Sequence, residues 1–83
     1  MKIHLRYFAS LREALGLAHE SIDTHAQTAS DLRRQLQARG DPYQQALADE
    51  RALRCAIDQQ LCDWNTPLIE GAEVAIFPPV TGG

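Results

Sequence analysis

The chain has 83 residues, of which 45% are hydrophobic and 23% are charged, and its net charge is −3 at pH 7. This length suits a single domain with one modest core, so we treat residues 1–83 as one domain. The acidic balance argues against nucleic-acid binding, which normally uses a basic cluster. No apolar run approaches the ~18 residues of a membrane-spanning helix, and the first residues do not resemble a signal peptide. We therefore expect a cytoplasmic protein that binds neither nucleic acid nor membranes.

The first third of the chain predicts a strand, a short helix and a second strand. Apolar and polar residues alternate over residues 2–8, as in a half-buried strand. Its apolar face carries Ile3, Leu5 and Tyr7. Ser10 and Glu13 have the spacing of a capping box, which predicts a helix that starts at Ser10 and ends near Gly16. The mostly polar residues 18–24 then predict a strand at the edge of a sheet.

The middle of the chain predicts the main helix. Thr28, with Asp31 three residues later, has the pattern of a helix cap, and Gly40 marks the helix end. Asp41 followed by Pro42 predicts a second, short helix, with Asp41 as its cap and Pro42 at its first position.

Alternation returns over residues 53–57, and a polar turn leads to a further strand over residues 61–64, which together predict a hairpin. Leu68 and Ile69 are expected to pack inward, and the last strand is expected over residues 73–77. Apolar strands at both ends of the chain suit a mixed sheet whose first and last strands lie side by side at its centre. With five strands, one main helix and short additional helices, this α+β arrangement is the β-grasp, or ubiquitin-like, fold.

The residues that follow the last strand predict a flexible, extended tail over residues 78–83. Pro78 and Pro79 remove two backbone donors and fix φ near about −65°, so strand pairing cannot continue past them. Gly82 and Gly83 have no Cβ, which leaves the final carboxylate unshielded and the tail thin enough for a narrow channel. We expect this tail to be the part of the chain that is presented to a partner.

Two aromatic residues stand where the alternation places solvent-facing side chains. Phe8 and Phe77 each lie at the end of a strand, and parallel pairing of those strands brings both beside the start of the tail. An apolar pair at this place is typical of a partner surface. The side of the sheet on which Leu61 lies is left open by the turn before it.

The chain contains no pattern of a metal or catalytic site. Cys55 and Cys62 are seven residues apart, without the spacing of a zinc site, and we expect free thiols, with Cys55 in the core. The three histidines are scattered and are expected to be exposed to solvent. We expect no metal and no permanently bound cofactor.

Three segments resemble a known family, the small subunits of molybdopterin synthase. They are Tyr-Phe-Ala-Ser-Leu-Arg-Glu at 7–13, Glu-Gly-Ala-Glu-Val at 70–74 and Phe-Pro-Pro-Val-Thr-Gly-Gly at 77–83. The resemblance covers essentially the whole chain, and the last segment is its most specific part. It implies a ubiquitin-like sulfur carrier of molybdenum cofactor biosynthesis.

The resemblance also implies a reaction sequence. An E1-like enzyme uses ATP to adenylate Gly83, and sulfur from a donor protein then replaces AMP to leave a thiocarboxylate. The tail enters the large synthase subunit, where sulfur passes to cyclic pyranopterin monophosphate, and the catalytic groups are expected there. The family complex is a heterotetramer. By resemblance, the residues that contact the large subunit are Phe8, Leu61, Phe77, Pro78, Pro79, Val80 and Thr81, while Gly82 and Gly83 form the reactive end.

Three alternatives stay open from the sequence. A sulfur carrier of thiazole synthesis shares the fold and the Gly-Gly end. A ubiquitin-like protein modifier would instead join Gly83 to a lysine. A plain interaction domain would carry an inert tail.

Overall fold

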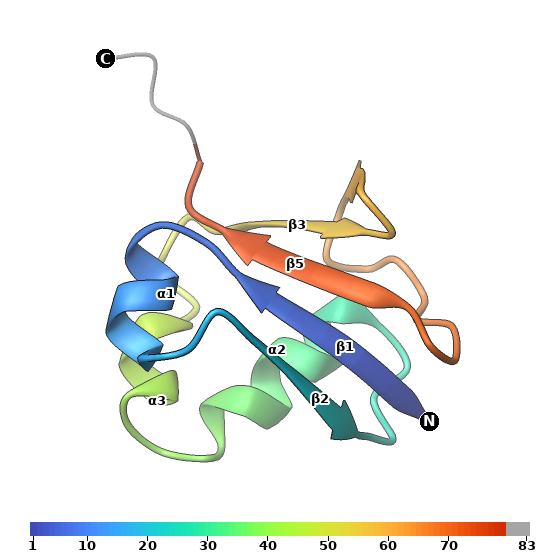
Figure 1. The fold of residues 1–83 in the computed structure, drawn as a ribbon, viewed down its shortest axis with the longest axis horizontal. Helices are drawn as coiled ribbons and strands as arrows, with labels where there is room; N and C mark the ends of the chain where they lie inside the picture. Colours follow the sequence, from blue (N-terminus) through green and yellow to red (C-terminus); the bar gives the residue numbers. More distant parts are fainter. Residues whose placement is uncertain (80–83) are drawn as a thin grey trace.

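The computed structural model describes residues 1–79 of the chain. Its elements are β1 (Lys2–Tyr7), α1 (Ser10–Leu15), β2 (His19–Asp23), α2 (Ala29–Gln37), α3 (Tyr43–Ala46), β3 (Arg54–Ile57), β4 (Gln60–Cys62) and β5 (Glu73–Phe77). The strands form one sheet in the order β2-β1-β5-β3-β4 (Figure 1). β1 and β5 are parallel and the other neighbouring pairs are antiparallel. The predicted β-grasp arrangement, with the first and last strands adjacent inside the sheet, is confirmed.

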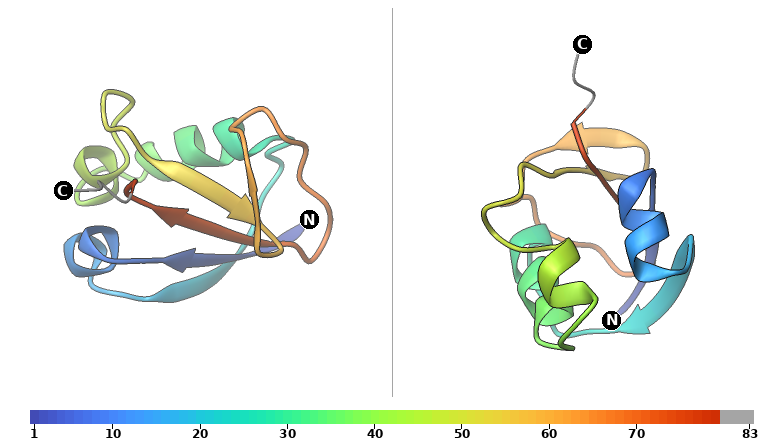
Figure 2. Two further views of the ribbon diagram at one scale, coloured as in Figure 1. Left: turned by 90° about the horizontal axis from the view of Figure 1, so that it is seen from above. Right: turned by 90° about the vertical axis from the view of Figure 1, so that its left-hand side faces the viewer.

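The core lies between the sheet and α2. Side chains along β1 and β5 alternate between buried and accessible positions, so each strand contributes every second residue to the core. Fully buried members from these three elements share one cluster: Ile3, Leu5, Leu32, Leu36, Val74 and Ile76. Figure 2 shows α2 along one face of the sheet, with α1 and α3 at the end where β1 and β5 finish. No helix within residues 1–79 covers the opposite face of the sheet, which we call the open face.

Two of the three helix caps predicted from the sequence, those of α1 and α2, have different outcomes. The Thr28 hydroxyl accepts a hydrogen bond from the Asp31 backbone N–H at 3.1 Å, so the cap of α2 is confirmed. The capping box at Ser10 is wrong. Ala9 is the residue before α1, with φ at 52°, and no side chain caps the helix. Because Ser10 is already helical, its hydroxyl is one position too late to cap the first turn.

The short helix α3 also begins differently from the prediction. Pro42 stands before the helix, not at its first position, and no side chain caps α3. The Asp41 carboxylate accepts a hydrogen bond from the Gln45 side chain at 3.1 Å instead. The cap predicted for Asp41 is therefore wrong, because its side chain is engaged with another side chain one turn along the helix.

The hairpin between β3 and β4 is confirmed with a tighter turn. Only Asp58 and Gln59 separate the strands, and their φ angles are 50° and 70°. Two consecutive positive φ values are those of a type I′ turn, whose twist suits a two-residue hairpin. β4 ends at Cys62, because the Asp63 side chain accepts from the Asn65 N–H at 2.9 Å and turns the chain away.

The loop before β5 buries one of two adjacent apolar residues and exposes the other. Leu68 is buried, as predicted, but Ile69 is 69% exposed, so its predicted inward packing is wrong. The Ala72 N–H donates to the Ile69 carbonyl at 3.0 Å, and Gly71 has φ at 81°. This turn directs only one of the two side chains toward the core.

None of the helices within residues 1–79 combines the length and apolarity needed to cross a membrane.

Candidate functional site

The open face of the sheet carries a row of side chains that the strand register defines. Leu61 of β4 pairs with Ala56 of β3, which pairs in turn with Ala75 of β5. On the other side of β5, Ala75 pairs with Arg6 of β1. Cross-strand partners point to the same face of a sheet. The row therefore runs from an exposed leucine, over two small residues, to an arginine.

Two aromatic residues lie next to this row. Phe77 is two residues beyond Ala75 on β5 and therefore points to the same open face. The Phe8 backbone N–H donates to the Ile76 carbonyl at 3.3 Å, which keeps Phe8 beside the end of β5. The Arg6 guanidinium carbon lies 5.5 Å from the centroid of the Phe8 ring, so this ring is also on the open face.

We call these five apolar residues the docking surface: Phe8, Ala56, Leu61, Ala75 and Phe77. Phe8 is 39% exposed and Leu61 is 59% exposed, while Phe77 is half-buried. The sequence left the side of Leu61 open, and its pairing with Ala56 places it on the same face as the aromatics. An exposed apolar group of this kind is a candidate interaction site.

Ala56 and Ala75 are the members of the docking surface that sequence reasoning missed. They occupy outward positions of the alternating pattern, where an alanine carries little signal of its own. On the sheet, the two alanines lie side by side between Leu61 and Arg6, where no long side chain rises above the strands. A partner can approach the strands more closely there than over long side chains.

The predicted tail begins at the edge of the docking surface. Pro78 is half-buried and Pro79 is exposed, and both follow β5 outside the sheet pairing. A proline has no backbone N–H to donate, which explains why β5 ends at Phe77. The remaining predicted site residues lie outside the described part of the chain: Val80, Thr81, Gly82 and Gly83.

The two cysteines are free, as predicted, and face each other across β3 and β4. Their Sγ atoms are 3.7 Å apart. Burial, together with the contact to Cys62, raises the pKa of the Cys55 thiol to about 12. Cys55 is therefore protonated at neutral pH and does not supply a thiolate nucleophile.

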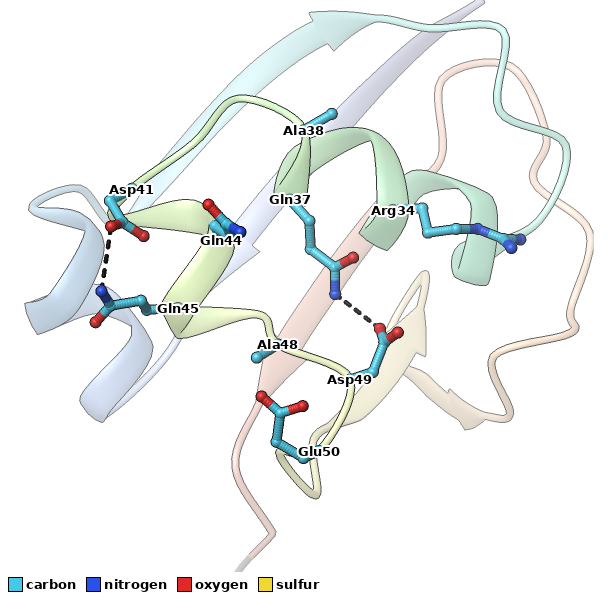
Figure 3. A pocket seen from close by; sticks show the side chains of 9 residues that line it. All are labelled: Arg34, Gln37, Ala38, Asp41, Gln44, Gln45, Ala48, Asp49 and Glu50. Atoms are coloured by element: carbon cyan, nitrogen blue, oxygen red, sulfur yellow. Dashed lines mark hydrogen bonds between the residues drawn. The ribbon is translucent and has the colours of Figure 1, made fainter.

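Within residues 1–79, no three His, Cys, Asp or Glu side chains gather in a way that could hold a metal ion. A groove of about 620 Å³ lies between α2, α3 and the loop that follows α3 (Figure 3). Its polar side chains bond to one another: Gln37 Nε2 donates to Asp49 Oδ1 at 2.8 Å, and Gln45 donates to Asp41. The groove lies on the helical side of the molecule, away from the docking surface.

Comparison with known proteins identifies the family of this chain. The ThiS family matches residues 5–83 of the chain. The chain is 38% identical to the molybdopterin synthase sulfur carrier subunit of Escherichia coli (strain K12). The alignment spans 81 residues and covers 98% of this chain and 99% of that protein.

Two solved structures extend the comparison. One is a chain in the protein–protein complex of subunits 1 and 2 of the molybdopterin-converting factor from Helicobacter pylori 26695. It is 28% identical, with a TM-score of 0.67 and full coverage of both chains. The other is the small archaeal modifier protein 1 from Methanosarcina acetivorans, which shares the fold with a TM-score of 0.77. It is 22% identical, and the match covers 99% of this chain and 96% of that one. From the family match and the near full-length identity, we conclude that this chain belongs to the ThiS family, beside the molybdopterin synthase sulfur carrier subunits.

Proposed function

We propose that this protein is the sulfur carrier of a molybdopterin synthase and that Gly83 carries the sulfur as a thiocarboxylate. The observation that supports this most directly is the position of the docking surface immediately before a tail that ends in Gly82-Gly83. The 38% identity to a sulfur carrier subunit of this kind supports the same assignment.

The proposed reaction begins at the carboxylate of Gly83. A carboxylate is a poor acyl donor, so an E1-like enzyme joins it to the AMP of ATP and releases pyrophosphate. Sulfur delivered by a donor protein then displaces AMP and leaves the thiocarboxylate. A side chain at Gly83 would crowd the attack on this carbonyl, which explains the glycine.

The second half of the reaction takes place in the large synthase subunit. The docking surface holds the folded part of the carrier against that subunit, and residues 78–83 reach into its active site. Sulfur of the Gly83 thiocarboxylate bonds to cyclic pyranopterin monophosphate, water cleaves the C–S bond to Gly83, and the carrier leaves with its carboxylate restored. Two carriers and a large-subunit dimer form the heterotetramer of this proposal.

The two prolines fit the requirement for an ordered tail. Fixing a free residue in one conformation costs about 1–2 kcal/mol of chain entropy. Pro78 and Pro79 restrict the backbone before binding, so less entropy is lost when the tail enters a channel.

The test is the intact mass of the protein after incubation with cell extract, ATP and a sulfur source. We expect a mass gain that matches replacement of one oxygen by sulfur and that maps to Gly83. A variant without Gly82 and Gly83 is the control and should show no gain. An unchanged mass, in an extract that thiolates the Escherichia coli relative, would contradict the proposal, and lysine-linked conjugates would indicate a protein modifier.

A further inference from the structure

Positive charges border the docking surface although the whole chain carries a net charge of −3. Arg54 pairs with Phe77 across β3 and β5, and Arg6 pairs with Ala75 across β1 and β5. Both arginines are exposed. They stand diagonally on either side of β5, and strand spacing and rise per residue put their Cα atoms about 12 Å apart.

His19 extends the same border on the edge strand β2. It pairs with Arg6 across β1 and β2 and is exposed. His4, two residues before Arg6, also points to the open face, where its Nδ1 lies 2.7 Å from Ser21 Oγ. The row that begins at Leu61 thus continues beyond its two alanines into polar, nitrogen-bearing side chains.

Carboxylates within residues 1–79 offset these charges unevenly. Arg6 forms an ion pair with Glu73 on this face, with 4.0 Å between Nη1 and Oε2. In the same part of the chain, no carboxylate lies within ion-pair distance of Arg54. Arg54 therefore presents its charge to solvent beside Phe77, with the exposed Asp63 lining the same hollow outside ion-pair distance.

The apolar side chains of the docking surface and the charged side chains at its border have different effects on binding. Apolar contact is non-directional and roughly proportional to the area removed from water, so it does not fix the orientation of a partner on a flat sheet. Charges at the border steer the encounter and set the register. Two separated arginines define a direction on the surface, which a single charge does not.

We propose that Arg6 and Arg54, with His19 beside them, recognise carboxylates that border an apolar patch on the partner protein. This inference rests on the proposed function, in which that partner is the large synthase subunit. The partner's apolar side chains cover the docking surface, and its acidic groups meet the arginines on both sides of β5. The contact orients the carrier so that the segment from Pro78 onward faces the partner's active site.

The test is the dissociation constant for the large synthase subunit of the same organism, measured by titration calorimetry at low and at moderate salt. Arg54→Gln is the cleaner variant, because Arg6 also contacts the Phe8 ring. From the strength of exposed ion pairs, we expect about 2- to 5-fold weaker binding for each of Arg6→Gln and Arg54→Gln. The double variant should also show a shallower dependence on salt.

Arg34→Gln is the matched control. It removes the same charge from the exposed side of α2, which covers the opposite face of the sheet. We expect it to bind like the wild type. A double variant that binds like the wild type at both salt concentrations would overturn the charged border while leaving the proposed function in place. A wild-type chain that does not bind the large subunit would overturn both.

Discussion

The Tyr7 hydroxyl donates a hydrogen bond to Glu20 Oε2 at 2.9 Å, and this pair is the centre of a network that ties the sheet to the helices. The Tyr43 hydroxyl donates to the same oxygen at 2.9 Å. Arg39 Nη1 donates to both carboxylate oxygens, at 3.0 and 3.2 Å. One carboxylate thus connects β1, β2, α3 and the segment that follows α2.

The network changes the ionisation of its members. Burial disfavours the charged form of Glu20, but hydrogen bonds from Arg39, Tyr7 and Tyr43 outweigh it and lower the pKa of this carboxyl. Burial, followed by the bond to Glu20, raises the pKa of Tyr7 far above its ordinary value. The ionised carboxylate and the neutral phenol are therefore the forms that stabilise the fold.

Replacing Glu20 with Gln should destabilise the protein by about 1–2 kcal/mol at pH 7, because two phenols and a guanidinium lose a charged acceptor. A group whose pKa is lowered by folding stabilises the protein above its unfolded pKa. That stabilisation is lost as the pH falls through the folded pKa. Urea unfolding of wild type and Glu20→Gln should therefore converge in acid. Glu13→Gln, in the exposed part of α1, is the control, and a gap that stays constant with pH would contradict the role of Glu20.

The caps of α1 and α2 give a paired stability test. Thr28→Ala should lower the free energy of unfolding by about 1 kcal/mol, because the Asp31 N–H loses its acceptor. Ser10→Ala should change stability by less than about 0.5 kcal/mol, because no side chain caps α1. Thermal unfolding of both variants measures the difference. Equal losses would mean that Ser10 caps α1 after all.

Arg33 holds the loop that follows α3. It is 9% exposed, and its guanidinium donates to the carbonyls of Leu47, Ala48 and Arg51 while lying 4.7 Å from the Trp64 ring centroid.

A lysine at position 33 has neither the planar fork nor the flat stacking surface of arginine. We expect Arg33→Lys to lose about 2–4 kcal/mol of stability, since the partly buried carbonyls of Ala48 and Arg51 lose their donor. Urea unfolding measures this loss. The control variant Arg34→Lys, on the exposed side of the same helix, should change the free energy of unfolding little. A similar effect of the two variants would contradict a structural role for Arg33.

The docking surface can be tested with two apolar residues that are both more than half exposed. Leu61→Ser should weaken binding to the large synthase subunit about 10-fold, as expected for an exposed apolar residue that is covered in an interface. Ile69→Ser removes a comparably exposed side chain at the other end of the sheet and should bind like the wild type. Both variants should keep their stability within about 0.5 kcal/mol. Equal affinities would place the contact elsewhere.

Strand alternation and helix caps predicted most of the fold because they depend on local chemistry. The alternation around Tyr7 and Val74 located both central strands, since burial on one face of a strand repeats every second residue. The cap at Thr28 was predicted because its hydrogen bond reaches a backbone N–H only three residues along the chain. Ser10 has the right neighbours for a cap, but the residue before the helix is Ala9, with φ at 52°, so Ser10 is already helical and cannot cap the first turn.

The features that the sequence did not reveal depend on pairing across strands. The two alanines of the docking surface became recognisable only when the register placed Ala56 opposite Ala75. Likewise, the 3.7 Å separation of the Cys55 and Cys62 Sγ atoms results from a two-residue turn, whereas the sequence suggested three. A change of one residue in that turn reverses the side on which Leu61 points.

The central position of β5 also bears on how the protein is made. A chain that stops before Glu73 lacks the strand to which both β1 and β3 bond, so its remaining strands fall into two separate pairs. The pairing of β1 with β5 joins segments from opposite ends of the chain, and such contacts form only after a long loop closes. Folding therefore finishes only when synthesis has reached the segment that leads into the tail. An interrupted translation product does not present the docking surface, and it does not compete with finished molecules for the partner.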